Sequence, residues 1–309
     1  MYERDELREY IKNSELRIFN KKIKIRLSSE LAKKYDKGIY TNYLIRLQKE
    51  LEMLEKLQIK YPGNAKPFLY LYIVPDDNFI KLLQVPSTFS KGKKGGGKPV
   101  ACYDLDGFNL AFGLSQNCLE NKDINNKEIE RIENEIHELS HIILGQFMAE
   151  NQAISEGVAE ALPLFGLDLE EEFLSHQEVL VSLDKDKIYS MKELLKKSRE
   201  RTYGDDPILP GKSCSFRLSY LSSYLFVRGI MEIISEKYCL SKESSIQYFL
   251  EILKTCSIRC SNEFLIYDIA NALELPEEKL LMEKSIQEKA IHSILEKYSE
   301  NSKKNIKGR

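Results

Sequence analysis

The hydrophobic period of the chain changes near residue 126, and this change constrains the fold more than any other feature. Ahead of it, residues 18–27 alternate apolar and basic side chains, and residues 68–74 form a run of aromatic and branched residues. Both patterns predict strands. Residues 100–104 and 108–112 predict two short strands, and the Asp-Gly turn between them indicates a hairpin.

Beyond residue 126 the apolar residues recur at helical spacing. A helix is expected from Ser155 to about Leu162, where Pro163 should end it. We expect the later helices over residues 191–200, 217–238, 243–254, 261–273 and 277–297. A strand-rich first half and a helical second half favour an α+β architecture.

Composition narrows the classes of function. Lysine and arginine number 46 against 48 aspartate and glutamate, which gives a formal net charge of -2. This balance favours neither a nucleic-acid partner nor a membrane surface. No apolar run reaches the roughly 18 residues that a transmembrane helix needs. The charged N-terminus also lacks the apolar segment of a secretory signal, so a cytoplasmic protein is expected.

The cysteines and the glycine-rich loop point to no site. Six cysteines are scattered without a paired framework, so we expect free thiols in a reducing compartment. Cys256 and Cys260 share a helical face, but no second pair lies nearby in sequence to complete a structural zinc site. Residues 90–98 are rich in glycine and lysine but lack the ending of a phosphate-binding loop, so a solvated loop is expected.

Residues 137–141 read His-Glu-Leu-Ser-His on one of the expected helices. Because positions i and i+4 share a helical face, His137 and His141 can reach one metal ion from the same side. Glu138 is rotated about 100° from His137, which places it beside the metal rather than on it. A carboxylate there can take a proton from water and pass it to a leaving amine.

Zinc needs a third protein ligand, and Glu156 is the candidate, with Glu160 as the alternative. Glu160 lies on the same helical face, where it can accept a hydrogen bond from a ligand imidazole and orient it. Two acids near a helix start would also suit the helix dipole. The alternative is that both histidines are buried core residues of an ordinary helix. Burying two polar imidazoles in this way costs free energy unless both are hydrogen-bonded.

At these residues the chain resembles the gluzincin metallopeptidases, and most of all the peptidase-MA-like bacterial proteins. In that group the His-Glu-x-x-His segment is followed by a zinc-binding glutamate, often in a Ser-Glu-Gly-x-Ala segment, which residues 155–159 match. The resemblance implies one zinc ion held by His137, His141 and Glu156, with Glu138 as general base and acid.

The resemblance also implies an oxyanion donor and a substrate-binding strand. A tyrosine downstream of the zinc site often stabilises the oxyanion in this group, so Tyr220 is the candidate, with Tyr224 as the alternative. Either residue can instead be a core tyrosine of an amphipathic helix. An edge strand commonly pairs with extended peptide in this group, a role for residues 107–113 unless they are simply a hairpin strand.

The expected fold is a thermolysin-like α+β catalytic domain, with a small N-terminal mixed sheet, an edge hairpin and a mostly helical C-terminal half. Residues 1–165 would form the sheet subdomain with the active-site helices, and residues 166–309 the helical subdomain of the same catalytic unit. The expected function is zinc-dependent hydrolysis of peptide bonds. The alternatives are a zinc hydrolase of a small amide or modified peptide, and a catalytically silent scaffold that binds peptides.

Overall fold

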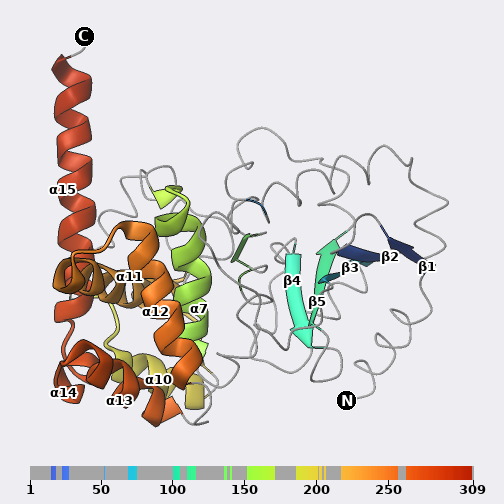
Figure 1. Ribbon diagram of the computed structural model, residues 1–309, viewed down its shortest axis with the longest axis horizontal. Helices are drawn as coiled ribbons and strands as arrows, with labels where there is room; N and C mark the ends of the chain where they lie inside the picture. Colours follow the sequence, from blue (N-terminus) through green and yellow to red (C-terminus); the bar gives the residue numbers. More distant parts are fainter. Residues whose placement is uncertain are drawn as a thin grey trace. The chain divides into compact units, whose positions relative to one another are not determined.

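The structure is a computed structural model, and Figure 1 shows its course. It describes residues 15–18, 23–27, 52, 69–74, 100–104, 110–115, 136–137, 140, 152–170, 186–200, 202–203, 205–206, 217–256 and 262–307. The chain divides into two compact units, Met1–Gly145 and Gln146–Arg309.

The described strands belong to the first unit. They are β1 (Glu15–Ile18), β2 (Ile23–Leu27), β3 (Leu69–Val74), β4 (Val100–Asp104) and β5 (Leu110–Ser115). Their order in the sheet is β1-β2-β3-β5-β4. The two outer pairings, β1 with β2 and β4 with β5, are antiparallel, whereas β3 is parallel to both of its neighbours.

The strands differ from the sequence expectations in two places. Residues 18–27, expected as one strand, include the end of β1 and all of β2, which pair antiparallel. Residues 110–113 of the segment expected to bind peptide lie in β5, which pairs with β3 on one side and β4 on the other. Because both sides of its backbone are occupied, that part of residues 107–113 offers no open edge, and within the described sheet the edges are β1 and β4.

The described elements of the second unit are helices. They are α7 (Gln152–Ala161), the π-helix η1 (Leu162–Gly166), α10 (Met191–Arg199), α11 (Leu218–Tyr238), α12 (Lys242–Cys256), α13 (Asn262–Leu273), α14 (Glu277–Leu281) and α15 (Ser285–Lys307). Local sequence explains where α10 begins. Ser190 and Glu193 form a capping box, in which the Ser190 hydroxyl accepts from Glu193 N and the Glu193 carboxylate accepts from Ser190 N.

The 21-residue helix α11 forms the centre of this unit. It packs against α7, α12 and α15, and Figure 1 shows α7 and α12 alongside it. Phe226 and Ile230 on α11 are fully buried, as are Val158 on α7 and Phe249 on α12. Burial on so many sides explains why α11 is apolar around much of its circumference rather than along one stripe.

The helices over residues 191–200, 217–238, 243–254 and 261–273 are confirmed to within two residues at each end. Two other expectations were wrong. Pro163 does not end the helix there, because the chain continues as η1 through Gly166, closed by a hydrogen bond from Leu167 N to Leu162 O of 3.1 Å. The single helix expected over residues 277–297 is two helices, α14 and α15.

The expectation of a thermolysin-like α+β domain is wrong. Of the residues whose side chains the structure describes, 80% are helical and none lies in a strand. The five strands of the first unit are described by their backbone pairing alone. The described body of the second unit is an all-helical one built around α11. The division of the chain falls after Gly145, before α7, whereas the sequence suggested a boundary after residue 165.

Among the residues that the structure describes, no helix is both long and apolar enough to span a membrane.

Candidate functional site

The His-Glu-Leu-Ser-His segment is described at His137 and Ser140, together with Ile136 just before it. All three residues are helical, and the Ser140 hydroxyl donates to Ile136 O at 2.7 Å, a bond within one helical turn. His137 is 2% exposed. Burying an imidazole costs free energy unless its nitrogens are bonded, so His137 has a structural or metal-binding task rather than a surface one. Glu138 and His141 lie outside the described residues.

Helix α7 carries Glu156 and Glu160 one turn apart, and we call these two residues the acidic face of α7. Glu156 is half-buried and Glu160 is 2% exposed. The helix begins at Gln152, before the expected Ser155, and has no acidic residue in its first turn. The expectation that the helix dipole stabilises both carboxylates is therefore wrong, because that effect fades beyond the first turn.

Gly157 lets α7 approach α11 closely, next to the acidic face. A β-carbon on Gly157 would lie 2.6 Å from the Ser223 main-chain oxygen and 2.7 Å from a Val227 methyl carbon. Any larger residue would have to push the two helices apart. The glycine of the Ser-Glu-Gly-Val-Ala segment thus sets how closely the helix that carries Glu156 and Glu160 packs on α11.

Tyr203 lies at this helix contact and was not singled out from the sequence. It is 4% exposed, and its hydroxyl lies 2.6 Å from Ser223 Oγ and 3.2 Å from Ser219 O. Burial raises the pKa of Tyr203 well above its ordinary value, and the carboxylates of Glu156 and Glu160 act in the same direction. Tyr203 is therefore a neutral phenol within the electrostatic field of the acidic face.

Tyr220 and Tyr224 lie one turn apart on α11 in different surroundings. The ring of Tyr220, 3% exposed, meets the ring of Tyr203 edge-on, with centroids 5.4 Å apart and planes at 65°. The Tyr224 hydroxyl instead donates to the buried carboxylate of Glu170. The structure thus brings Tyr220, rather than Tyr224, together with Tyr203 near the acidic face.

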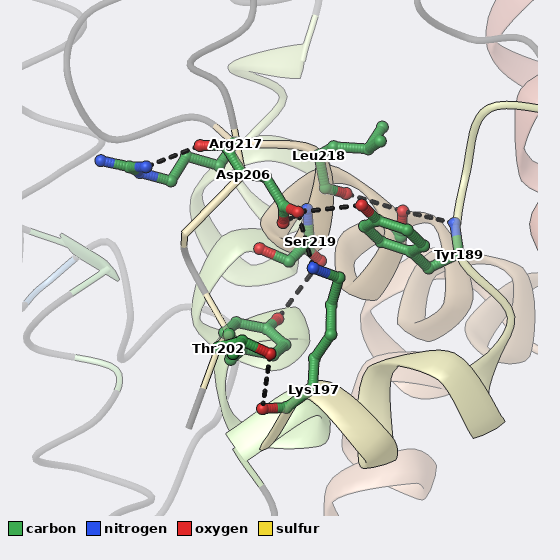
Figure 2. A network of polar contacts seen from close by, with 9 residues as sticks. Tyr189, Lys197, Thr202, Asp206, Arg217, Leu218 and Ser219 are labelled. Carbon is green, nitrogen blue, oxygen red and sulfur yellow. Dashed lines mark hydrogen bonds and ion pairs between the residues drawn. The ribbon is translucent and has the colours of Figure 1, made fainter. Parts of the chain in front are cut away.

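Asp206 organises the start of α11, and Figure 2 shows Tyr189 and Lys197 directed at its carboxylate. Its Oδ1 accepts from Lys197 Nζ at 2.8 Å and from Tyr189 Oη at 2.9 Å. Its Oδ2 accepts from Ser219 N at 3.1 Å. The side chain of the N-cap residue Arg217 makes no capping hydrogen bond. The carboxylate of Asp206 therefore takes the place of an N-cap side chain by accepting the Ser219 N–H.

Burial and hydrogen bonding shift the pKa of Asp206, whose side chain is 4% exposed, in opposite directions. Burial alone would raise the pKa of its carboxyl, but hydrogen bonds from Lys197, Ser219 and Tyr189 outweigh burial and lower that pKa. Burial likewise opposes the charge of Lys197, and the carboxylate of Asp206 outweighs it, so the pKa of Lys197 is raised. The pair is therefore ionised at neutral pH.

A second buried cluster joins η1 to α11. Arg228 is 3% exposed and pairs with Glu170 and Glu232, and its guanidinium carbon lies 4.8 Å from the centre of the Phe165 ring. Tyr224 donates to the same Glu170. Arginine and tyrosine together compensate a carboxylate that is 1% exposed, so this cluster is structural.

Two histidines lie outside the His-Glu-Leu-Ser-His segment, and one of them, His176, lies outside the described residues. His292 on α15 has a side chain that is 74% exposed, and its Nδ1 lies 3.3 Å from a Glu296 carboxylate oxygen. An exposed pair of this kind contributes little to stability.

The expected metal ligands fall in both units, His137 in the first and Glu156 in the second. Among the described residues, no three His, Cys, Asp or Glu side chains form a group able to hold a metal ion. No family model matches the chain, and no curated protein sequence matches it.

Sequence reasoning missed Tyr203 and Asp206 because both lie in a connection between helices, where no periodicity marks a buried residue. One signal was present. Ser219 and Ser223 are spaced i, i+4 in the first, mostly buried half of α11. Such a pair predicts a polar partner from elsewhere in the chain, because buried hydroxyl groups are almost always hydrogen-bonded.

Proposed function

We propose that the chain is a zinc-dependent peptidase of gluzincin type. His137, His141 and Glu156 would hold one zinc ion, with Glu160 orienting a ligand. Imidazole nitrogen and carboxylate oxygen are donors that zinc accepts in catalytic sites. Scattered cysteines support a reducing, cytoplasmic setting as part of the proposal.

The observation that carries the proposal is the His-Glu-Leu-Ser-His segment with a buried His137 in a helical turn. Two of only four histidines in the chain occur in this segment, one turn apart. The acidic face of α7 adds support, because it lies at a tight helix contact next to two buried tyrosines. Carboxylates close to tyrosine hydroxyl groups are an arrangement suited to metal ligation and to oxyanion binding.

In this proposal zinc, when bound, lowers the pKa of a water molecule and polarises the scissile carbonyl. Glu138 takes the proton from that water and returns it to the leaving amine. Tyr220 donates a hydrogen bond to the oxygen on which negative charge develops. The backbone of a peptide substrate would be bound in extended form, a mode that reads few side chains.

The replacement Glu138→Gln tests the role of the base. It should leave zinc content unchanged and lower the rate of peptide hydrolysis at least about 100-fold, the usual contribution of a general base. Glu200→Gln, on an exposed helix end where the side chain is 55% exposed, is the matched control and should hydrolyse at the wild-type rate. Undiminished hydrolysis by Glu138→Gln would exclude the proposed role.

A panel of peptides with free and blocked termini, together with small amides, distinguishes the rival functions. Cleavage of peptides supports the proposal, and the position of the cut separates endopeptidase from exopeptidase action. Cleavage of small amides alone would replace it with a small-amide hydrolase. Zinc binding without cleavage of any of them would favour a peptide-binding scaffold.

A further inference from the structure

Tyr203 packs on the turn of α11 that lies against α7. Its hydroxyl is bound to Ser219 and Ser223 of α11, and its ring contacts Tyr220 of the same helix. Ser223 is also the residue against which Gly157 of α7 packs. We propose, resting on the peptidase function above, that Tyr203 is a positioning residue that holds Tyr220 in place beside the acidic face of α7.

The hydrogen-bond directions follow from the chemistry of the three groups. The Ser219 carbonyl can only accept, so the phenol of Tyr203 donates its single proton there. The Ser223 hydroxyl then donates to the Tyr203 oxygen at 2.6 Å. Both bonds anchor Tyr203 to one turn of α11, the same turn that carries Tyr220.

The contact with Tyr220 explains how this anchoring reaches the proposed oxyanion donor. An edge-on pair of aromatic rings has a preferred geometry, so an immobile Tyr203 restricts the tilt of Tyr220. Tyr203 is 4% exposed and its hydroxyl is already bonded twice. It is therefore placed to orient Tyr220 rather than to donate to a substrate itself.

The connection that carries Tyr203 is itself held firmly. Asp206, three residues later, accepts from Ser219 N on α11 and from Lys197 on α10. The Arg217 guanidinium donates to Asp206 O at 2.6 Å. These bonds attach the connection to the start of α11, at the N-cap residue Arg217 and at Ser219, so the position of Tyr203 is set by the same helix turn that it supports.

Kinetics of single and double variants test the positioning role. Tyr203→Ala should lower kcat about 10- to 100-fold, the scale on which a misplaced catalytic group costs rate, with KM and zinc content little changed. Tyr203→Phe keeps the ring but loses both anchoring hydrogen bonds, so it should recover only part of that loss. In a Tyr220→Phe background, Tyr203→Ala should lower kcat by less than about 3-fold, because residues that act as a unit are not additive.

Equal losses of kcat from Tyr203→Ala in the wild-type and Tyr220→Phe backgrounds would overturn the proposal, as would a wild-type rate in Tyr203→Ala. The matched control is Tyr248→Ala on α12, where the ring is 37% exposed and packs on Tyr238. It should leave kcat unchanged.

A spectroscopic measurement keeps this inference separate from the peptidase proposal. In protein labelled with fluorotyrosine, the signal lost in Tyr220→Phe identifies Tyr220. That fluorine signal should shift or broaden in Tyr203→Ala and stay in place in Tyr248→Ala. An unmoved Tyr220 signal would exclude the positioning role. A wild-type protein without hydrolysis would exclude only the peptidase function.

Discussion

Gly157 lies so close to Ser223 that a β-carbon on the glycine would approach the serine main-chain oxygen to 2.6 Å. Real β-carbons do not come that near a carbonyl oxygen, so this glycine sets the distance between α7 and α11. The adjacent Glu156 depends on it, because α7 carries the acidic face. A residue of the expected metal-binding segment thus has a packing role as well.

We predict that Gly157→Ala lowers the free energy of unfolding by about 1–3 kcal/mol, the usual cost of overpacking. It should also lower zinc retention and hydrolysis, because α7 must move away from α11. Chemical denaturation and zinc analysis of the folded protein measure both effects.

The control for this variant is Gly229→Ala. Its β-carbon would meet the main-chain oxygen of Ile286, where α11 packs against α15. This variant should lose comparable stability yet keep zinc retention and hydrolysis in the folded fraction. If Gly157→Ala kept full zinc and full activity, the acidic face would not be part of the site.

Asp206→Asn should destabilise the protein in a pH-dependent way. Burial raises the pKa of Asp206, but its hydrogen bonds prevail and hold the folded-state pKa below the unfolded value of about 4. The stabilisation is therefore present above that pH and is lost as pH falls through the folded-state pKa. We expect a loss of about 1–3 kcal/mol at pH 7, the range for hydrogen bonds to a charged group.

Denaturation of wild type and Asp206→Asn from pH 7 down to pH 3 measures this difference, which should shrink at the acid end. Glu200→Gln breaks only an exposed pair with Lys196 and should change stability by less than about 0.5 kcal/mol at any pH. A difference for Asp206→Asn that stayed constant with pH would show that its charge is not the cause.

Replacing Tyr220 or Tyr224 by Phe should have opposite consequences. Tyr220→Phe should lower kcat about 100- to 1000-fold, the cost of removing one oxyanion donor. Tyr224→Phe should leave kcat unchanged but lower stability by about 1–3 kcal/mol, because the buried carboxylate of Glu170 loses a donor. Steady-state kinetics and denaturation of both variants decide the assignment, and a drop in kcat confined to Tyr224→Phe would reverse it.

Arg228→Ala should be among the most destabilising changes in the second unit. Removing one partner of a buried ion pair leaves an uncompensated charge at Glu170 and costs about 3–5 kcal/mol. The double variant Arg228→Ala with Glu170→Ala should lose less than the sum of the single losses. Additive losses in thermal or chemical denaturation would contradict a direct pairing.

Periodicity was a good guide to the long helices of the chain and a poor one to their ends and partners. Helix α11 was expected within one residue, because its apolar residues recur over many turns. Pro163 misled, since a proline early in η1 costs little where no regular hydrogen bond is required of its nitrogen. Tertiary packing, which a single sequence does not display, decided both this extension and the break between α14 and α15.

The candidate site, too, could be predicted from the sequence only in part. Burial of His137 and Glu160 agrees with a task inside the protein, as the spacing of polar residues on apolar helices suggested. Tyr203 and Asp206 escaped notice because their partners on α11 lie 16 and 13 positions further along the chain. Contacts of that separation depend on how a loop folds back, and no local pattern encodes them.

The zinc content of the purified protein, measured by elemental analysis, shows whether the chain binds the proposed metal ion. We expect about one zinc ion per chain for the wild type and for Glu138→Gln, with strong loss from His137→Ala, His141→Ala and Glu156→Ala, as for a site with three protein ligands. Less than about half an equivalent in the wild type after zinc is added, or full zinc in all three ligand variants, would contradict it.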